Sequence, residues 1–183
     1  MNSDELKTLQ APLKERYKAE PSAAMITLRA SGRASDGISC SVETGRALVK
    51  AGLHPATGGD GSLACSGDLL LEALVACAGV TLSAVATAIG VELRDAVVTA
   101  EGDLDFRGTL GVAKDVPVGF GAIRLQFDLD TDASSDQVAT LLKLTERYCV
   151  VYQTLRRPPD VQVVVRAARG GADAASSRTG SRP

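Results

Sequence analysis

Aromatic residues and histidine are scarce in this sequence. It has no Trp, three Tyr, three Phe and a single histidine, His54. A Ser-His-Asp triad or a histidine-based metal site would therefore depend on His54 alone, and no G-x-S-x-G nucleophile elbow accompanies it. No basic stripe interleaved with aromatics is present and the net charge is −2, so nothing supports nucleic-acid binding. These absences leave sulfur as the main candidate for chemistry.

The sequence also lacks the usual cysteine patterns. Its four cysteines, Cys40, Cys65, Cys77 and Cys149, include no C-x-x-C pair, and their spacings match no zinc motif. The N-terminal residues are charged and contain no apolar signal-peptide region. We therefore expect a cytoplasmic protein with reduced thiols, no bound cofactor and no metal.

The longest apolar stretch covers residues 66–90, SGDLLLEALVACAGVTLSAVATAIG. Its two charges, Asp68 and Glu72, stand at its start, and apolar or small side chains would occupy every face of a helix built from it. Such a helix belongs inside a protein or inside a bilayer. Residues 73–89 are at the short limit of a membrane span, and no basic loop or aromatic belt flanks them. We predict a buried central helix that ends at Gly90.

The rest of the sequence alternates between strand and helix patterns. They predict an α+β protein with helices against one face of a mainly antiparallel sheet. Three regions are expected: a helical extension (residues 1–21), the main domain (22–167) and a disordered tail (168–183). In the first part of the chain we predict a helix at 3–19, then a hairpin of strands Met25–Ser31 and Ile38–Glu43 around a turn at 32–37, and a strand within 48–53. After the central helix we predict strands within 92–107 and 123–130, helices from Ser135 to Cys149 and from Val150 to Leu155, and a last strand at Asp160–Arg166.

The residues by themselves leave the role of each cysteine open. Cys40 lies on an apolar strand face, as a core residue would. Cys65 precedes the central helix, where the helix dipole can lower a thiol pKa, and Cys149 follows Arg147 at a helix end. Cys77 lies mid-helix among apolar residues, which should raise its pKa and leave it inert unless a cation arrives from elsewhere in the fold.

Two segments carry a family resemblance. The segment DLLLEALVACAGVTLSAVATAIG resembles the helix motif P-x-E-L-L-L-A-A-L-x-x-C of the OsmC/Ohr family, the osmotically inducible protein C and organic hydroperoxide resistance proteins. TERYCVVYQTL resembles the second signature of that family, x-x-x-C-P-V-S-x-x-L. The resemblance covers roughly residues 22–167 and places the sequence in the broader OsmC-like branch.

This resemblance implies both a fold and an activity. The fold would be an intertwined homodimer in which antiparallel sheets wrap around long central helices. The activity would be a thiol-dependent peroxidase, an antioxidant enzyme of the oxidative stress response. Cys77 would attack an organic hydroperoxide and become a sulfenic acid, Cys149 would resolve it to a disulfide, and a dithiol would reduce the disulfide. The resemblance also implies an arginine that activates Cys77, best matched by Arg33 with Arg29 as the fallback, and held by Asp68.

The sequence departs from the family motifs at three positions. Gly67 stands where the hydroperoxide-resistance branch has a glutamate, Ser66 replaces a proline near the helix start, and Val150 replaces the proline after the second cysteine. These departures keep an alternative open, a non-catalytic OsmC-like stress protein that binds a small apolar ligand. A further variant retains the peroxidase chemistry but uses Cys65 as the resolving thiol.

Overall fold

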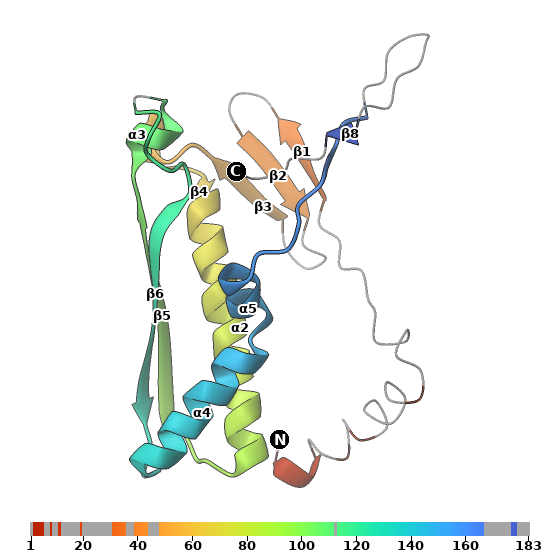
Figure 1. Ribbon diagram of the computed structural model, residues 1–183, viewed down its shortest axis with the longest axis vertical. Helices are drawn as coiled ribbons and strands as arrows, with labels where there is room; N and C mark the ends of the chain where they lie inside the picture. The colour runs from red at the N-terminus through yellow and green to blue at the C-terminus, as the bar shows by residue number, and fades with distance from the viewer. Residues whose placement is uncertain are drawn as a thin grey trace.

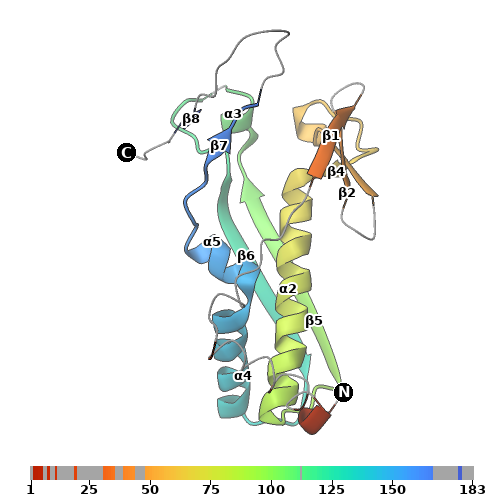
Figure 2. The same ribbon diagram turned by 90° about the vertical axis from the view of Figure 1, so that its right-hand side faces the viewer.

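The computed structural model shows an elongated molecule built around one long helix (Figure 1). Two long strands run along this helix, two further helices pack beside it, and a small sheet lies at one end (Figures 1 and 2). The structure describes residues 2–5, 8, 11, 19, 31–35, 39–43, 48–111, 113–166 and 177–178.

The elements follow one another in an order that agrees with the α+β prediction. They are β1 (Ser31–Ser35), β2 (Ser39–Glu43), β3 (Leu48–Gly52), the 3-10 turn η2 (Pro55–Thr57), β4 (Ala64–Cys65), α2 (Ser66–Ile89), β5 (Asp95–Leu104), α3 (Phe106–Thr109), β6 (Phe120–Asp130), α4 (Ser135–Tyr148), α5 (Val150–Arg156), β7 (Val163–Val164) and β8 (Ser177–Arg178).

The long helix α2 confirms the prediction made from its apolar stretch. It begins at Ser66 and ends at Ile89. Gly90 closes it in the left-handed conformation, with φ of 73°, and its N–H donates to the Ala86 carbonyl. A residue without a Cβ adopts this cap at little cost, which explains why the helix stops there.

Strands β5 and β6 form a long antiparallel hairpin against α2. Their register pairs Asp95 with Asp130 and continues to Leu104. Apolar residues alternate along both strands and turn toward the helices, as predicted, whereas the other face is charged and carries Arg124 bonded to Glu101 and Asp103. The first strand is shorter than predicted because Asp105 caps the short helix α3, which takes Phe106 out of the strand.

Helices α4 and α5 pack on α2 and are separated by one residue, Cys149. Ser134 and Gln137 form a reciprocal capping box, and α4 begins at the predicted Ser135. Leu141 and Thr145 then face the core, where Leu141 packs with the second half of α2. The helix order and the break at Cys149 are as predicted.

The small sheet has the order β1-β2-β3-β4, with β3 and β4 parallel. The predicted hairpin is present, but its turn is wrong: Ser31 to Ser35 form strand β1, and Ser35 pairs with Ser39. Arg33 therefore pairs with Ser41 inside the sheet and does not lie in the turn. The extended backbone can continue through this Gly- and Ser-rich segment because β2 offers it a full antiparallel partner.

Both ends of the chain are described only in part. Residues 3–5 are helical, in agreement with the predicted N-terminal helix, and Asn2 and Glu5 cap each other there. The strand predicted at 160–166 is reduced to Val163–Val164, because its partner β8 offers only the two residues Ser177–Arg178. The predicted domain boundaries near residues 21 and 167 lie outside the described residues.

One face of α2 is uncovered in the single chain, so the predicted burial of this helix is only partly met within one copy. Its buried residues, Leu74, Ala78, Leu82, Val85 and Ala86, form a single stripe, and only 28% of its most apolar 18 residues are buried. In the part of the chain that the structure describes, α2 is the one helix long and apolar enough to span a membrane. Figure 2 shows that α4, α5 and the β5–β6 hairpin leave one of its sides open.

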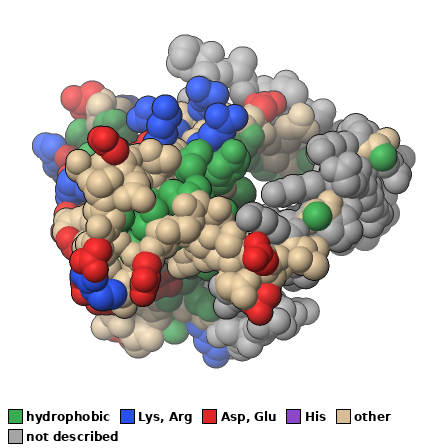
Figure 3. All heavy atoms as spheres, turned by 90° about the horizontal axis from the view of Figure 1, so that it is seen from below, with side chains coloured by type: hydrophobic (Ala, Val, Ile, Leu, Met, Phe, Trp, Pro, Cys, Tyr) green, Lys and Arg blue, Asp and Glu red, His purple; other side chains and the backbone are tan. Residues whose placement is uncertain are grey.

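The uncovered face consists of small and apolar residues. Val80 is 73% exposed, and exposed alanines and serine neighbour it at helical spacing, namely Ala73, Ala76, Ser83 and Ala84. Seen from the end at which α2 finishes, hydrophobic side chains reach the surface at the centre of the view, with Lys and Arg side chains along one margin (Figure 3). The described chain therefore does not supply a cover for its own central helix.

Replacing Leu141 with alanine tests the assignment of the core. Leu141 is fully buried in the cluster formed with the second half of α2, so we expect Leu141→Ala to lower the free energy of unfolding by about 2–5 kcal/mol. Leu110→Ala is the control, because Leu110 is 56% exposed and its loss should change the free energy by no more than about 0.5 kcal/mol. Chemical denaturation followed by circular dichroism measures both, and equal values would contradict this core.

Candidate active site

The site is centred on two sulfur atoms that the fold brings together from positions 72 residues apart. Cys77 lies on the third turn of α2 and Cys149 lies between α4 and α5. Cys149 is fully buried at 1% exposure and packs with Leu74 and Ala78 on α2, while Cys77 packs against the same cluster and is half-buried. Both are free thiols, and the Cys149 side chain is within hydrogen-bonding distance of Cys77.

Cys77 lies at the border between two faces of α2. On one side are the buried Leu74 and Ala78, and on the other the exposed Ala76 and Val80. The thiol is therefore reached from the uncovered face of the helix, whereas its partner Cys149 is enclosed by the core. This placement suits a reactive sulfur backed by a protected one.

The hydrogen bonds around Cys77 favour its thiolate. Burial raises the pKa of the Cys77 thiol, but the backbone N–H of Val151, the side chain of Cys149 and the backbone N–H of Val150 lower it, and the net shift is downward. The Thr81 hydroxyl donates to the carbonyl of Cys77 at 2.7 Å. The resulting pKa of the Cys77 thiol lies below the ordinary value of cysteine. Donors directed at a charged form stabilise that form even where water is excluded.

The pKa of Cys149 moves in the opposite direction. Burial raises it, and so do the hydrogen bond with Cys77 and the negative charge that develops there, although the backbone N–H of Tyr152 acts against them. Cys77 therefore loses its proton more readily than Cys149. This order of ionisation suits a nucleophile paired with a second thiol.

The break between α4 and α5 supplies two of these donors. At Cys149 the backbone is extended, with φ of −71° and ψ of 108°. In an uninterrupted helix the N–H groups of Val150 and Val151 would bind the carbonyls of Glu146 and Arg147. The break directs both toward Cys77 instead. Val150 contributes here because it is not proline, since proline has no N–H.

The predicted cation is not required for this effect. The fold places Arg33 in β1, but its side chain and all of Arg29 lie outside the described residues. The expectation that Cys77 has a raised pKa unless a cation reaches it is wrong, because backbone amides from α5 stabilise the thiolate. The roles of Arg33 and Arg29 stay predictions.

Two other predicted site residues lie at the start of α2. Asp68 is exposed in the first turn, nine residues before Cys77, or about 13 Å along the helix axis. Cys65 precedes the first residue of α2, twelve residues or about 18 Å from Cys77. A disulfide needs Cα atoms within about 7 Å, so Cys65 does not resolve Cys77 in the same chain.

The single histidine, His54, has a structural place. Its ring stacks on Phe106 with 4.8 Å between centroids, and its Nδ1 accepts a hydrogen bond from the Ala56 N–H. These contacts join the loop after β3 to α3. The described residues include no group of three or more His, Cys, Asp or Glu side chains that could hold a metal ion.

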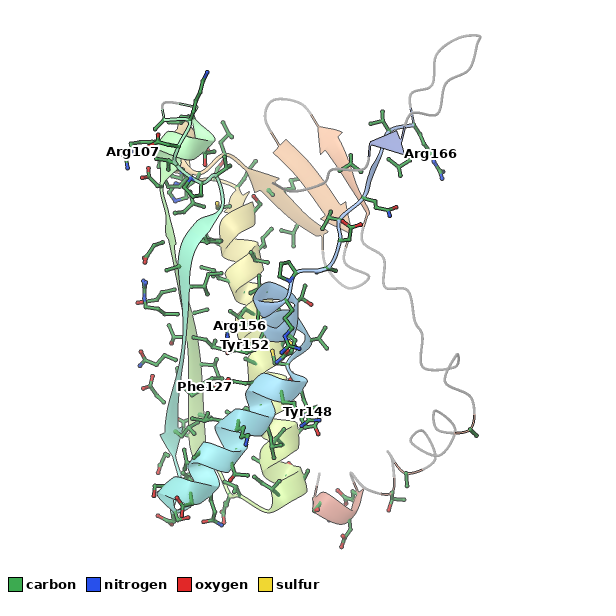
Figure 4. The ribbon with its side chains drawn as sticks, viewed as in Figure 1. Arg107, Phe127, Tyr148, Tyr152, Arg156 and Arg166 are labelled. Atoms are coloured by element: carbon green, nitrogen blue, oxygen red, sulfur yellow. The ribbon has the colours of Figure 1, made fainter. Side chains whose placement is uncertain are left out.

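An apolar cavity of about 660 Å³ adjoins the sulfur pair. Its walls share Leu74, Phe127 and Leu155 with the cluster around Cys149. Tyr152 and Arg156 border it from α5, as Figure 4 shows, and the Tyr152 hydroxyl donates to Glu146. The full lining is Leu70, Leu74, Gly119, Phe120, Gly121, Ala122, Ile123, Leu125, Phe127, Glu146, Tyr152, Leu155 and Arg156.

Sequence reasoning missed the groups that act on Cys77 through hydrogen bonds. No sequence pattern identifies the N–H groups of Val150 and Val151 as donors to Cys77. Only the predicted break between two helices at Cys149 indicated that backbone donors would be free there.

Comparison with known proteins agrees with this geometry. The family model described as OsmC-like protein matches residues 59–164, which is more than half of the chain and includes both cysteines. No curated protein matches the sequence.

Solved structures of the same family share the fold. An OsmC-like protein from Mycoplasma pneumoniae superposes with a TM-score of 0.61 at 16% identity, covering 73% of this chain and 89% of that chain. An organic hydroperoxide resistance protein OsmC from Legionella pneumophila gives 0.57 at 18% identity, covering 73% and 91%. One from Elizabethkingia anophelis gives 0.56 at 16% identity, also covering 73% and 91%. With the family model matching most of the ordered core, the chain belongs to the OsmC-like family.

Proposed function

We propose that this protein is a thiol-dependent peroxidase that reduces organic hydroperoxides in the cytoplasm. One observation carries the proposal: Cys77 and Cys149 are in contact and their pKa values are shifted in opposite directions. Some structural neighbours are named organic hydroperoxide resistance proteins, which supports the same chemistry. Oxidative damage is the stress against which such an enzyme would act.

The first step uses the ionised sulfur. The Cys77 thiolate attacks the distal oxygen of the hydroperoxide, a sulfur–oxygen bond forms and the oxygen–oxygen bond breaks. The leaving alkoxide takes up a proton and departs as an alcohol, while Cys77 becomes a sulfenic acid. The sulfur is oxidised by two electrons and the peroxide is reduced by the same two.

The second step uses the protected sulfur. Cys149 attacks the Cys77 sulfenic acid, the two sulfurs form a disulfide, and the hydroxyl leaves as water. A dithiol reductant then reduces the disulfide by exchange and restores both thiols. The position of Cys149 beside Cys77 favours this step, because no large movement has to precede bond formation.

The surroundings of the site favour an apolar substrate. Cys77 opens toward the uncovered face of α2, and apolar side chains line the adjoining cavity. A second copy of the chain that covers this face would complete the site and bury the exposed Val80. We propose a homodimer of this kind, in which Arg33 approaches Cys77 and Asp68 holds that arginine.

A non-catalytic OsmC-like protein that binds a small apolar ligand is the second candidate. The cavity of about 660 Å³ behind the sulfur pair favours it, since sites for small ligands have similar volumes and largely apolar walls. The two candidates differ in the use of Cys77, which a binding protein does not need.

Turnover tests the choice between them. We expect the wild type to consume cumene hydroperoxide with a dithiol reductant and Cys77→Ser to lose this activity by at least about a hundredfold, because the attacking thiolate is gone. Cys65→Ser should keep it, since Cys65 is far from Cys77 along α2. Equal consumption by the wild type and Cys77→Ser would contradict the peroxidase and leave the binding protein.

Replacing Val150 with proline tests the backbone donors. Proline suits the first residue of a helix, and the extended backbone of Cys149 is compatible with it. The change removes one N–H directed at Cys77, so the Cys77 pKa should rise by up to about one unit. The alkylation rate of Cys77 below its pKa should then fall by up to about tenfold.

Val150→Ala is the matched control, because it truncates the same side chain and keeps the N–H. Its alkylation profile against pH should coincide with that of the wild type. If Val150→Pro also coincides with the wild type, the backbone N–H of residue 150 does not stabilise the thiolate.

A lysine at position 80 tests the proposed homodimer. Val80 is 73% exposed on the uncovered face, and a buried unpaired charge in an interface costs several kcal/mol. Val80→Lys should therefore convert a dimer to a monomer, as measured by analytical ultracentrifugation. Val97→Lys is the control, because Val97 is exposed on β5 and away from the uncovered face of α2, and this variant should remain dimeric. A monomeric wild type, or a dimeric Val80→Lys, would refute the interface.

A further inference from the structure

We infer that Gln153 is a positioning residue, which holds the break between α4 and α5 open and so keeps the N–H of Val150 directed at Cys77. The inference rests on the proposed use of Cys77 as the ionised thiol. In the described structure Gln153 makes no hydrogen bond to either sulfur. It would act on the ionisation of Cys77 through the backbone alone.

Gln153 bridges the two helices. It lies in the first turn of α5, and its side-chain Nε2 donates to the carbonyl oxygen of Glu146, in the last turn of α4, at 2.7 Å. Its own backbone N–H donates to the carbonyl of Cys149 at 2.9 Å. One residue thus fixes α5 to the end of α4 and to the residue at the break.

The acceptor that Gln153 uses is the one that a continuous helix would give to Val150. In a regular α-helix the N–H of Val150 would bind the carbonyl of Glu146, four residues earlier. The Gln153 amide occupies this carbonyl and leaves the Val150 N–H free to face Cys77. Without the amide, the Glu146 carbonyl would lack this donor, and the N–H of Val150 is the group that helix geometry offers in its place.

A second contact ties the same two segments together. The Tyr152 hydroxyl donates to the Glu146 carboxylate at 3.2 Å. Arg156 lies one turn further along α5 and interacts with Tyr152. The titratable and charged groups around the break include Arg147 and Tyr148 at the end of α4, as well as Glu146, Tyr152, Arg156 and the two sulfurs. The Gln153 side chain is uncharged, so its replacement by methionine leaves the charge of the site unchanged.

The test replaces Gln153 with methionine, which has a similar length and no donor. The background is Cys65→Ser, because the tryptic peptide 51–94 then contains Cys77 as its single cysteine. Iodoacetamide is the probe, and the modified peptide is quantified by mass spectrometry as a function of pH. We expect the alkylation rate of Cys77 below its pKa to fall about threefold to tenfold in Gln153→Met, as for the loss of one hydrogen bond to a thiolate.

Gln137→Met is the control, since the Gln137 side chain also bonds to the backbone, where its Oε1 accepts from the Ser134 N–H in the capping box at the far end of α4. It should lower stability without changing the Cys77 profile. Gln153→Leu, which is uncharged and cannot donate, serves if the methionine variant fails to fold and should also slow alkylation. An unchanged Cys77 profile in a folded Gln153 variant, or an equal change in Gln137→Met, would overturn the inference.

The result is separable from the test of the peroxidase. Alkylation measures the ionisation of Cys77 whether or not the protein turns over a hydroperoxide. A wild type that reduces cumene hydroperoxide, with a Cys77 profile indifferent to Gln153, refutes this inference alone. A dependence on Gln153 in a protein without turnover refutes the peroxidase and upholds the positioning role.

Discussion

A sulfur anion in an apolar interior needs hydrogen-bond donors, and the chain supplies them by interrupting a helix. At Cys149 the backbone leaves the helical path for one residue, and the first N–H groups of α5 turn to Cys77 on the neighbouring helix. The same residue that makes the break contributes the second sulfur. The donors and the second thiol therefore reach Cys77 from one point of the fold, and the packing of α4 and α5 on α2 fixes both.

The two faces of α2 have different structural roles. Its buried stripe joins the β5–β6 hairpin, α4 and α5 into one core, and Cys149 lies inside that core. Its opposite face is apolar, built from small residues, and open. Cys77 stands at the border, where it receives donors from the buried side and is partly exposed on the other. In the proposed homodimer the second copy would exclude water from this border, which would strengthen every polar interaction of the thiolate.

The parts of this arrangement that depend on a local sequence pattern could be predicted. The bounds of α2, the alternation along β6 and the break at Cys149 all follow from periodicity and caps. Other features depend on distant partners. Arg33 lies in a strand because β2 pairs with it, and the strand near Val163 is short because its partner is short. The predicted direction of the Cys77 pKa shift was wrong, because the shift depends on backbone N–H groups that no side-chain pattern reveals.

The most direct test of this account compares Cys77 and Cys149 in one experiment on the Cys65→Ser protein. Tryptic digestion after alkylation places Cys149 in the peptide 148–156, and in a Cys65→Ser background Cys77 is the single cysteine of 51–94. Alkylation of both peptides is followed across pH. The account predicts that Cys77 titrates below the ordinary pKa of cysteine and Cys149 above it. The same midpoint for both thiols, or a lower one for Cys149, would contradict it.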